Sequence, residues 1–223
     1  MAMVGRRPFD PALYVVTDHR QTFEAMRDTV LAAVSGGATM VQLRNPDLGG
    51  RALLEQARLL MGALEASGVP LIVNDRVDVA AAAGAAGVHV GQSDLPASAA
   101  RAILGPAAII GLSITGLAQV ADLDVEAIDY IGVGPVFATG TKGDAAPALA
   151  LGGTAEIVAA SPVQAVAIGG IDASNAAAVL TTGVRGISVV SAISRARDPR
   201  AAARVLRLAV DRAVPSTFPV GRP

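Results

Sequence analysis

The hydrophobic positions of the chain form short apolar runs, and longer segments of helical period separate these runs. The runs are rich in Val, Ile and Leu and are continuously apolar rather than alternating, which is typical of parallel strands buried on both faces. This pattern predicts eight strands: Leu13 to Val16, Met40 to Leu43, Leu71 to Val73, Val88 to Val90, Ile109 to Ser113, Tyr130 to Val133, Val163 to Ile168 and Gly186 to Val189.

Between the runs, apolar residues recur three or four positions apart, as they do on the buried side of a helix. Two such stripes are Phe23, Met26, Val30 and Val34, which follow a possible N-cap at Thr22, and Leu53, Ala57, Leu60 and Leu64. Ser174 and Asp198 are expected to cap helices over Asn175 to Leu180 and Arg200 to Val214, because Ser and Asp oxygens accept from free amides and Pro199 suits a first turn. Arg207 is expected to pair with Asp211.

Parallel strands need crossover helices, so eight strand-plus-helix units in 223 residues predict a closed α/β barrel, the (β/α)8 or TIM barrel. We expect a single domain over residues 1–223 with a flexible tail at 215–223. The alternative is an open, doubly wound sheet. That fold is disfavoured because Thr17-Asp18-His19, rather than a Gly-x-Gly-x-x-Gly motif, follows the first predicted strand.

Composition narrows the class of protein. The net charge of -1 and the aromatic fraction of 3% give no basic field and few stacking platforms, which argues against nucleic acid as a partner. Cysteine is absent, which excludes disulfides and thiolate chemistry. The first seven residues lack the apolar run of a signal peptide, and no run reaches the ~18 apolar residues of a membrane span. We expect a cytoplasmic protein without membrane partners, and a homo-oligomer remains compatible with the sequence.

Polar residues follow the predicted strands, and the carboxyl ends of barrel strands all open onto one face, where active sites lie. Strand by strand, they are Gln42 and Arg44; Asn74 and Asp75; Gln92 and Asp94; Ser113; and Thr139, Thr141 and Lys142. Phosphate often sits after strands seven and eight of such barrels, where the chain reads Gly169-Gly170 and Val190-Ser191. The sequence therefore predicts a phosphate-binding face, and simple turning of the chain is the alternative role of these glycines.

The segment from Gly134 to Asp144 concentrates glycines, two Thr hydroxyls and a Lys ammonium at one strand end, which suits an anion that needs several donors. A solvated connector is the plain alternative. Its glycines Gly140 and Gly143 make it a candidate lid. Asp75 and Asp94, without clustered histidines, favour Mg²⁺, which takes one or two carboxylates plus substrate oxygens.

The alternative for the two aspartates is a capping or ion-pair role, with Arg76 as a possible partner of Asp75. The two histidines have simpler interpretations. His89 lies inside an apolar run, so we expect it to be buried and hydrogen-bonded rather than catalytic, and His19 is expected at the surface.

Taken together, these motifs resemble the thiamine-phosphate synthase family along the chain from Leu13 to about Ser194. The segments that carry the resemblance are Val41-Gln42-Leu43-Arg44, Val73-Asn74-Asp75-Arg76, Gly87 to Gln92, Gly134 to Phe137 with Thr139-x-Thr141-Lys142, Ile168 to Ile171, and Ser188 to Ser194. Their order agrees as well as their content.

The resemblance implies that an aminopyrimidine methyl group leaves its pyrophosphate through a cation-like state and is captured by the nitrogen of a thiazole phosphate. It implies that the pyrimidine pyrophosphate is held by Gln42, Arg44, Asn74, Ser113 and Lys142, of which Arg44, Ser113 and Lys142 would be catalytic. It implies Mg²⁺ on Asp75 and Asp94. The thiazole phosphate would be held by Thr139, Gly140, Thr141, Gly170, Val190 and Ser191.

The chain departs from the family pattern at a few positions. The family shows Arg-x-Lys where this chain has Arg44-Asn45-Pro46, so one positive charge is missing, and Arg51 or Arg76 could replace it. Ala150 stands where the family has glycine, a change that we expect to loosen the loop. Two rival functions follow: a related thiazole tautomerase, which would need a His at Gly134 to Val136, and a non-catalytic phosphate-binding barrel.

Overall fold

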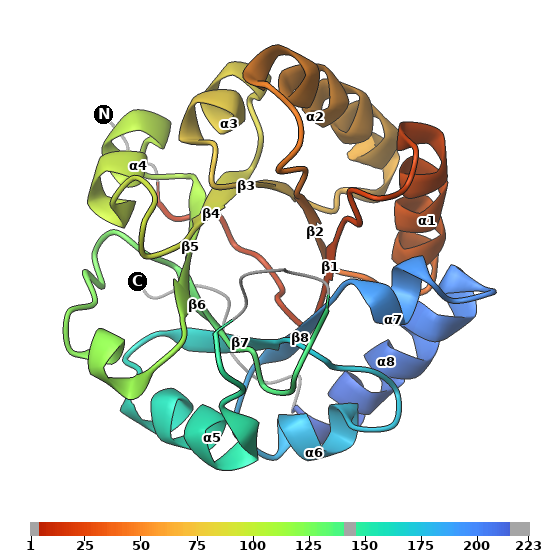
Figure 1. Ribbon diagram of the computed structural model, residues 1–223. Coiled ribbons are helices and arrows are strands. Elements are labelled where there is room, and N and C mark those ends of the chain that lie inside the picture. The colour runs from red at the N-terminus through yellow and green to blue at the C-terminus, as the bar shows by residue number, and fades with distance from the viewer. Residues whose placement is uncertain (1–4, 141–145, 215–223) are drawn as a thin grey trace.

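The protein is an eight-stranded parallel barrel in the computed structural model, which describes residues 5–140 and 146–214. The strands are β1 (Leu13–Val16), β2 (Met40–Leu43), β3 (Leu71–Asn74), β4 (Gly87–Val90), β5 (Ile109–Ile114), β6 (Tyr130–Val133), β7 (Gln164–Ile168) and β8 (Gly186–Val189). Each strand pairs with the next, and β8 pairs with β1, so the sheet closes (Figure 1). The predicted barrel is confirmed, and the open sheet is excluded.

Helices surround the barrel (Figure 1). They are α1 (Phe23–Ser35), α2 (Gly50–Leu64), α3 (Val77–Ala83), α4 (Ala97–Leu104), α5 (Ala150–Ala160), α6 (Ala176–Leu180), α7 (Ser191–Ser194) and α8 (Pro199–Ala213). The units are less regular than the sequence predicted. The connection from β5 to β6 contains a 3₁₀ turn, Leu117–Val120, instead of an α-helix, and two helices follow β8.

The predicted helix caps were right in two cases of three. The Thr22 hydroxyl accepts from the Ala25 amide at 3.3 Å, and the Asp198 carboxylate accepts from the Ala201 amide at 3.0 Å. Ser174 does not cap α6. Its amide and hydroxyl both donate to Asp172, so Asn175 becomes the N-cap residue.

The last helix contains the predicted ion pair. Arg207 and Asp211 of α8 lie 2.7 Å apart, four positions along the helix. This spacing places both side chains on one side of α8, as the sequence indicated.

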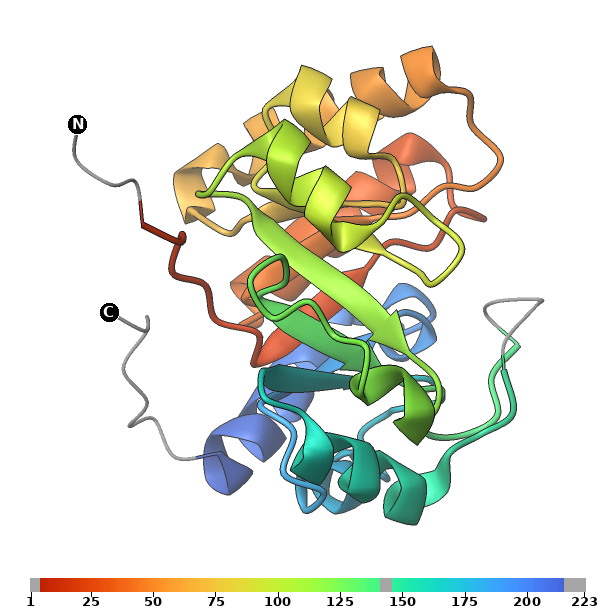
Figure 2. The same cartoon turned by 90° about the vertical axis from the view of Figure 1, so that its left-hand side faces the viewer.

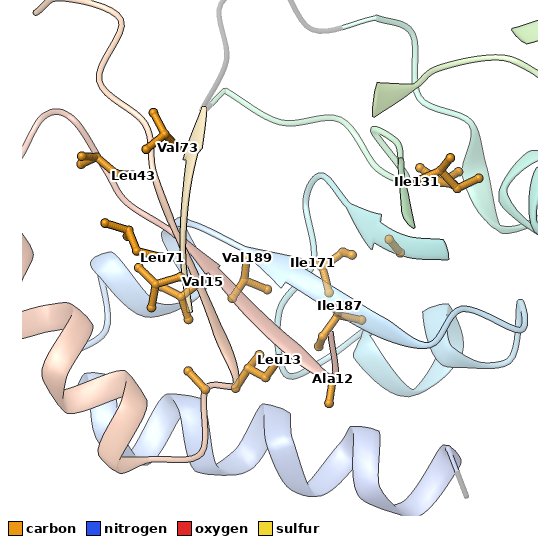
Figure 3. Packing of buried hydrophobic residues seen from close by; sticks show 14 of the residues in the cluster. Ala12, Leu13, Val15, Leu43, Leu71, Val73, Ile131, Ile171, Ile187 and Val189 are labelled. Carbon is orange, nitrogen blue, oxygen red and sulfur yellow. The ribbon is translucent and has the colours of Figure 1, made fainter. Parts of the chain in front are cut away.

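Two hydrophobic clusters stabilise the fold. The larger one fills the space between the strands and the helices, and Figure 3 shows Leu13 and Val15 of β1 with Ile187 of β8 among its members. The smaller one lies inside the barrel and consists of Tyr14, Met40, Ile72, Ala86, Ile109, Tyr130 and Val166, with Phe9 packed against it. Phe9 belongs to the red segment before β1, at the left-hand end of the barrel in Figure 2. The barrel interior is therefore filled from that end, which leaves the carboxyl ends of the strands for a site.

Ala150 adopts an unexpected backbone conformation at the first position of α5. Its φ angle is 54°, in the left-handed region that glycine tolerates and that side chains with a Cβ disfavour. Alanine here therefore strains the backbone, an effect that the sequence analysis did not predict.

Some predictions fall outside the described residues. These are the tail at 215–223 and the part of the candidate lid that includes Thr141, Lys142 and Gly143. In the part of the chain that is described, no helix has the length and apolar character needed to cross a membrane.

Candidate active site

A cavity of about 260 Å³ opens at the carboxyl ends of the strands. Eight of the residues predicted for the site line it: Gln42, Arg44, Asn74, Ser113, Thr139, Gly170, Val190 and Ser191. They come from six different strands or the loops that follow them, so the barrel brings together residues up to about 150 positions apart, as parallel strands do. The predicted residues Asp75, Asp94 and Gly140 are not among the lining residues, and Thr141 and Lys142 lie outside the described chain.

Five side chains form a continuous hydrogen-bonded chain across the inside of the barrel, which we call the interior relay: Gln42, Tyr14, Tyr130, His89 and Ser113. The Gln42 amide donates to the Tyr14 hydroxyl at 2.8 Å, and the Tyr130 hydroxyl donates to the same oxygen at 3.1 Å. His89 joins the other half, with Nδ1 2.9 Å from the Tyr130 oxygen and Nε2 2.9 Å from the Ser113 oxygen.

The hydrogen-bond directions along the relay determine the tautomer of His89. In the arrangement with the Tyr130 hydroxyl donating to Tyr14, the Tyr130 oxygen accepts from His89 and Nδ1 carries the ring hydrogen. Nε2 is then the acceptor of the Ser113 hydroxyl hydrogen. Ser113 consequently presents oxygen lone pairs to the cavity, while the hydrogen of Tyr14, whose oxygen already accepts two bonds, is left to donate elsewhere.

Burial keeps the relay in this neutral state. Desolvation raises the pKa of Tyr14 well above its usual value, and burial together with the neighbouring Tyr14 raises the pKa of Tyr130 in the same direction. Both phenols therefore keep their hydrogens at any ordinary pH. The prediction that His89 is buried and hydrogen-bonded is confirmed, although its ring also reaches the cavity.

Glycines make the room that the relay needs. A Cβ on Gly111 would lie 2.2 Å from the Tyr130 ring and 2.4 Å from His89 Nδ1, and a Cβ on Gly132 would lie 2.9 Å from the His89 ring. Both rings thus lie directly over the backbone of neighbouring strands. A larger residue at either glycine would displace the relay.

Thr17, which directly follows β1, holds Arg44 in place beside the cavity. The Thr17 hydroxyl accepts from the Arg44 amide at 2.9 Å and donates to the Arg44 carbonyl at 3.2 Å. Thr17 also receives a backbone bond, since its amide donates to the Gln42 carbonyl at 2.9 Å. This clamp fixes the backbone of Arg44, a residue that lines the cavity.

The two predicted metal ligands, Asp75 and Asp94, each contact the end of β4. The Asp75 amide donates to the His89 carbonyl at 2.8 Å, and one carboxylate oxygen of Asp94 accepts from the Gly91 amide at 2.7 Å. Asp75 has a φ of 59°, a conformation that Asp tolerates better than most residues. The possible Asp75–Arg76 pair is not the arrangement found, because Arg76 binds Asp78 at 2.6 Å.

The donor set at this place fits a hard cation. The Asp75 backbone amide and the Asp94 carboxylate both bond to one short stretch, His89 to Gly91, and Mg²⁺ commonly takes only one or two protein carboxylates. Among the described residues, no three His, Cys, Asp or Glu side chains gather in a metal-binding group. Any cation here would therefore need oxygens from the substrate or from water.

The opposite side of the cavity is made of main chain, and we call Gly169, Gly170, Val190 and Ser191 the β7–β8 rim. Gly169 and Gly170 have φ angles of 103° and 65°, and a Cβ on Gly170 would lie 2.8 Å from the Phe137 side chain. Only glycine fits there without strain. The Asn175 side chain donates to the Gly170 carbonyl at 2.8 Å and so steadies the turn.

Asp18 supports the β8 end of this rim from outside the cavity. Its carboxylate accepts from two Arg20 nitrogens, both at 2.7 Å, and from the Ser194 hydroxyl at 3.0 Å. The Arg20 contact holds the pKa of Asp18 at about 2, below its usual value. The pair therefore links the loop after β1 to α7, which begins at the rim.

The structure adds lining residues that the sequence analysis missed or placed elsewhere. His19, expected at the surface, is partly exposed and also lines the cavity, with Nε2 3.7 Å from the Asp47 carboxylate. Tyr14 and Ser188 were counted only as strand residues. Their polar atoms within otherwise apolar strands were the signal that could have singled them out.

The fold and the cavity define a (β/α)8-barrel enzyme whose site lies at the carboxyl ends of its strands, with an arginine and paired glycines suited to phosphate. The comparisons with known proteins agree. A family model described as thiamine monophosphate synthase matches residues 13–193. The chain belongs to this family.

Individual relatives support the same conclusion. The chain is 52% identical to the thiamine-phosphate synthase of Azorhizobium caulinodans over 205 residues, which cover 92% of this chain and 97% of that protein. It is similar to the solved thiamine phosphate pyrophosphorylase of Pyrococcus furiosus, with 37% identity, a TM-score of 0.81, and coverage of 91% of this chain and 96% of that one. A 3-hexulose-6-phosphate synthase, at 19% identity and a TM-score of 0.69 over 89% of this chain and 99% of that one, shares the fold alone.

Proposed function

We propose that this transferase joins an aminopyrimidine pyrophosphate to a thiazole phosphate with the help of Mg²⁺, giving thiamine phosphate and pyrophosphate. The observation that carries the proposal is the cavity itself, in which Gln42, Arg44, Asn74 and Ser113 face the β7–β8 rim across one space. One side thus offers polar and cationic side chains, and the other offers main-chain amides. Two substrates that each bear phosphate can lie between them.

The hard step is loss of pyrophosphate from the pyrimidine methyl carbon. The carbon–oxygen bond breaks with both electrons going to the pyrophosphate, and the electron-rich aminopyrimidine carries the positive charge. The thiazole nitrogen then forms the new carbon–nitrogen bond with its lone pair. Arg44, and Lys142 outside the described residues, would stabilise the departing anion, and one well-placed donor of this kind is commonly worth about 3 to 4 kcal/mol.

No general base is needed in this sequence of steps, because the thiazole nitrogen attacks with its own lone pair. The chain has only two histidines, and the ring hydrogen and lone pair of His89 are committed to Tyr130 and Ser113. The barrel contributes orientation instead, by holding nitrogen and carbon close together.

Mg²⁺ dependence is part of the proposal. Asp75 and Asp94 would hold the ion, which when bound neutralises negative charge on pyrophosphate oxygens. The matched variants are Asp75→Asn and Asp94→Asn, because Asn tolerates the left-handed backbone of Asp75 and can still accept from the Gly91 amide. Each should raise the Mg²⁺ concentration needed for half-maximal rate without changing the melting temperature. A melting temperature that falls with unchanged Mg²⁺ response would favour a structural role.

We also propose a cytoplasmic location, in keeping with the absence of cysteine. The thiazole tautomerase is less well supported, since Gly134, Pro135 and Val136 occupy the place where it would need a His.

The decisive test is release of pyrophosphate from purified protein supplied with both substrates and Mg²⁺. Release that requires all three supports the synthase. Pro46→Lys restores the family's missing positive charge, and Pro46→Gln serves as its uncharged control. Pyrophosphate release by Pro46→Lys alone would identify a synthase that has lost its activity. No pyrophosphate release by the natural chain or by either variant would favour a non-catalytic phosphate-binding barrel.

A further inference from the structure

Ser188 carries a hydroxyl for which the protein supplies no partner. It lies on the inner side of β8, is only 3% exposed, and lines the cavity. Its Oγ makes no hydrogen bond to any described residue. Leaving a buried polar atom unpaired is unfavourable, because the group loses its bonds to water and gains none in the protein, so such a group calls for an explanation.

The other buried hydroxyls show that this is a special case. Thr154 donates to the Ala150 carbonyl at 2.8 Å, Thr182 donates to the Val179 carbonyl at 2.7 Å, and Thr17 bonds Arg44. In the described part of the chain, Ser188 is the one buried hydroxyl side chain without a bond, and it lines the cavity. The cavity is the place from which a partner can come.

The surroundings of Ser188 indicate what kind of group that partner is. Its register neighbours are Tyr14 on β1 and Ile168 on β7, and Val166 lines the same part of the cavity. Tyr14 has a hydroxyl hydrogen left to donate, because its oxygen already accepts from Gln42 and Tyr130. Two neutral hydroxyls beside apolar side chains suit an uncharged polar ring rather than a phosphate.

We propose that Ser188 is a specificity-determining residue, whose hydroxyl bonds a ring nitrogen or amino group of the substrate's heteroaromatic ring at the floor of the barrel. The inference rests on the proposed function, under which this ring is the aminopyrimidine, and it adds a contact deeper than the rim residues. The phosphates then lie toward Arg44 and the β7–β8 rim, and the ring lies toward Tyr14 and Ser188.

If Ser188 has this role, the Ser188→Ala substitution should keep or raise the stability of the protein and lower its affinity for the ring. Ser188→Ala removes an unpaired polar atom, so the ligand-free protein keeps or gains stability. It also removes a bond that only the ring can make, so affinity for the ring falls. A purely structural hydroxyl would behave the other way, with stability lost and affinity kept.

The experiment measures binding of the aminopyrimidine pyrophosphate and of inorganic pyrophosphate to the full chain by calorimetry. For Ser188→Ala we expect about a tenfold rise in Kd for the ring compound, which corresponds to about 1.4 kcal/mol, and less than a twofold change for pyrophosphate. Ser188→Cys, of similar size but a weak donor, should behave like Ser188→Ala. Thr182→Ala is the control: its melting temperature should fall while both Kd values stay.

Two results would overturn the inference: unchanged affinity for the ring compound in Ser188→Ala, or equal losses for the ring compound and pyrophosphate. If unchanged affinity came with a lower melting temperature, an ordered water would satisfy Ser188. Failure of the proposed function looks different, because the wild-type chain would then bind no aminopyrimidine pyrophosphate and release no pyrophosphate from it.

Discussion

The floor of the cavity, by which we mean Tyr14, Tyr130 and Ser188, is built from side chains, whereas the β7–β8 rim is built from main chain. On the floor, Tyr14 and Tyr130 are held by neighbours that are themselves hydrogen-bonded, so each donor and acceptor has a fixed direction. At the rim, Gly169 and Gly170 expose backbone in conformations that a Cβ would prevent. Donors and acceptors with fixed directions can discriminate between different substrate rings. A rim of main-chain groups binds a phosphate in the same way whatever the rest of the substrate is. Variants of each region show whether the two regions are separable in this way.

Substitution of the rim glycine should have the largest effect. Gly170→Ala places a methyl group 2.8 Å from Phe137 at a φ of 65°. We expect the free energy of unfolding to fall by about 2 to 4 kcal/mol, from left-handed strain and overpacking together. Denaturant unfolding measures this change, and the KM for the thiazole phosphate should rise at least tenfold while the Kd of the aminopyrimidine pyrophosphate changes little.

Gly152→Ala is the matched control for the rim variant. Gly152 lies in α5 with open space around it, so alanine there should be neutral or stabilising by up to about 1 kcal/mol. If Gly170→Ala weakened both substrates equally, floor and rim would not be separable.

Breaking the relay in the middle should have the next largest effect. Tyr130→Phe keeps the ring but removes the acceptor of His89 Nδ1 and the donor to Tyr14, so unfolding should become easier by about 1 to 3 kcal/mol. Affinity for the aminopyrimidine compound should fall while that for inorganic pyrophosphate stays. Chemical denaturation and calorimetry measure the two quantities.

A double-mutant cycle shows whether the relay acts as a unit. Tyr14→Phe and Tyr130→Phe share one hydrogen bond, so the double variant should lose less stability than the sum of the two single variants. Strict additivity would contradict a continuous relay.

The support behind the rim gives a smaller, pH-dependent effect. Because Arg20 lowers the pKa of Asp18 from 3.8 to about 2, the ionised carboxylate stabilises the fold above pH 4, and this contribution is lost as pH falls through about 2. Asp18→Asn should therefore cost about 1 to 2 kcal/mol at pH 7, and the difference from wild type should shrink as pH falls from 4 to 2. Unfolding curves over this range measure it.

The exposed Asp28, paired with Arg27 at 2.8 Å on the surface of α1, is the control for the Asp18 variant. Asp28→Asn should change stability by less than about 1 kcal/mol at every pH, as exposed ion pairs do. A difference between Asp18→Asn and wild type that stays constant down to pH 2 would argue against the Arg20 contact as the cause.

The barrel could be predicted from the sequence because both faces of each strand are buried. β1, β2, β6 and β8 match the predicted bounds, and the other four strands differ by one residue at one end. The missing α-helix after β5 escaped prediction, since a 3₁₀ turn over Leu117–Val120 also buries its apolar Val120. Ser174 failed as a cap because the nearby Asp172 carboxylate competes for its hydroxyl and amide.

The site was predictable for residues at or just after the carboxyl ends of the strands and unpredictable for residues farther inside them. Gln42, Arg44 and Gly170 stand at strand ends, which converge in any barrel. Tyr14 and Ser188 point inward from the middle of apolar runs. Only the closed barrel shows which side of such a run faces the inside of the barrel and which faces the helices. Their contacts depend on register between distant strands, which local sequence does not encode.

The smallest predicted change concerns a residue outside both the floor and the β7–β8 rim, at the point where the loop after β6 leads into α5. Ala150→Gly should raise the free energy of unfolding by about 1 kcal/mol, because glycine relieves the strain at φ 54° and the exposed methyl group contributes little packing. The melting temperature should rise by about 2 to 4 °C for a chain of this size. Ala148→Gly, two residues earlier, exposed and without a positive φ, should be neutral or destabilising. Substrate affinities should be unchanged in both variants.

If Ala150→Gly instead lost stability as Ala148→Gly does, the left-handed conformation would not be the source of strain in this loop. The glycine of the family pattern at this position would then need another explanation, such as close approach to the β7–β8 rim.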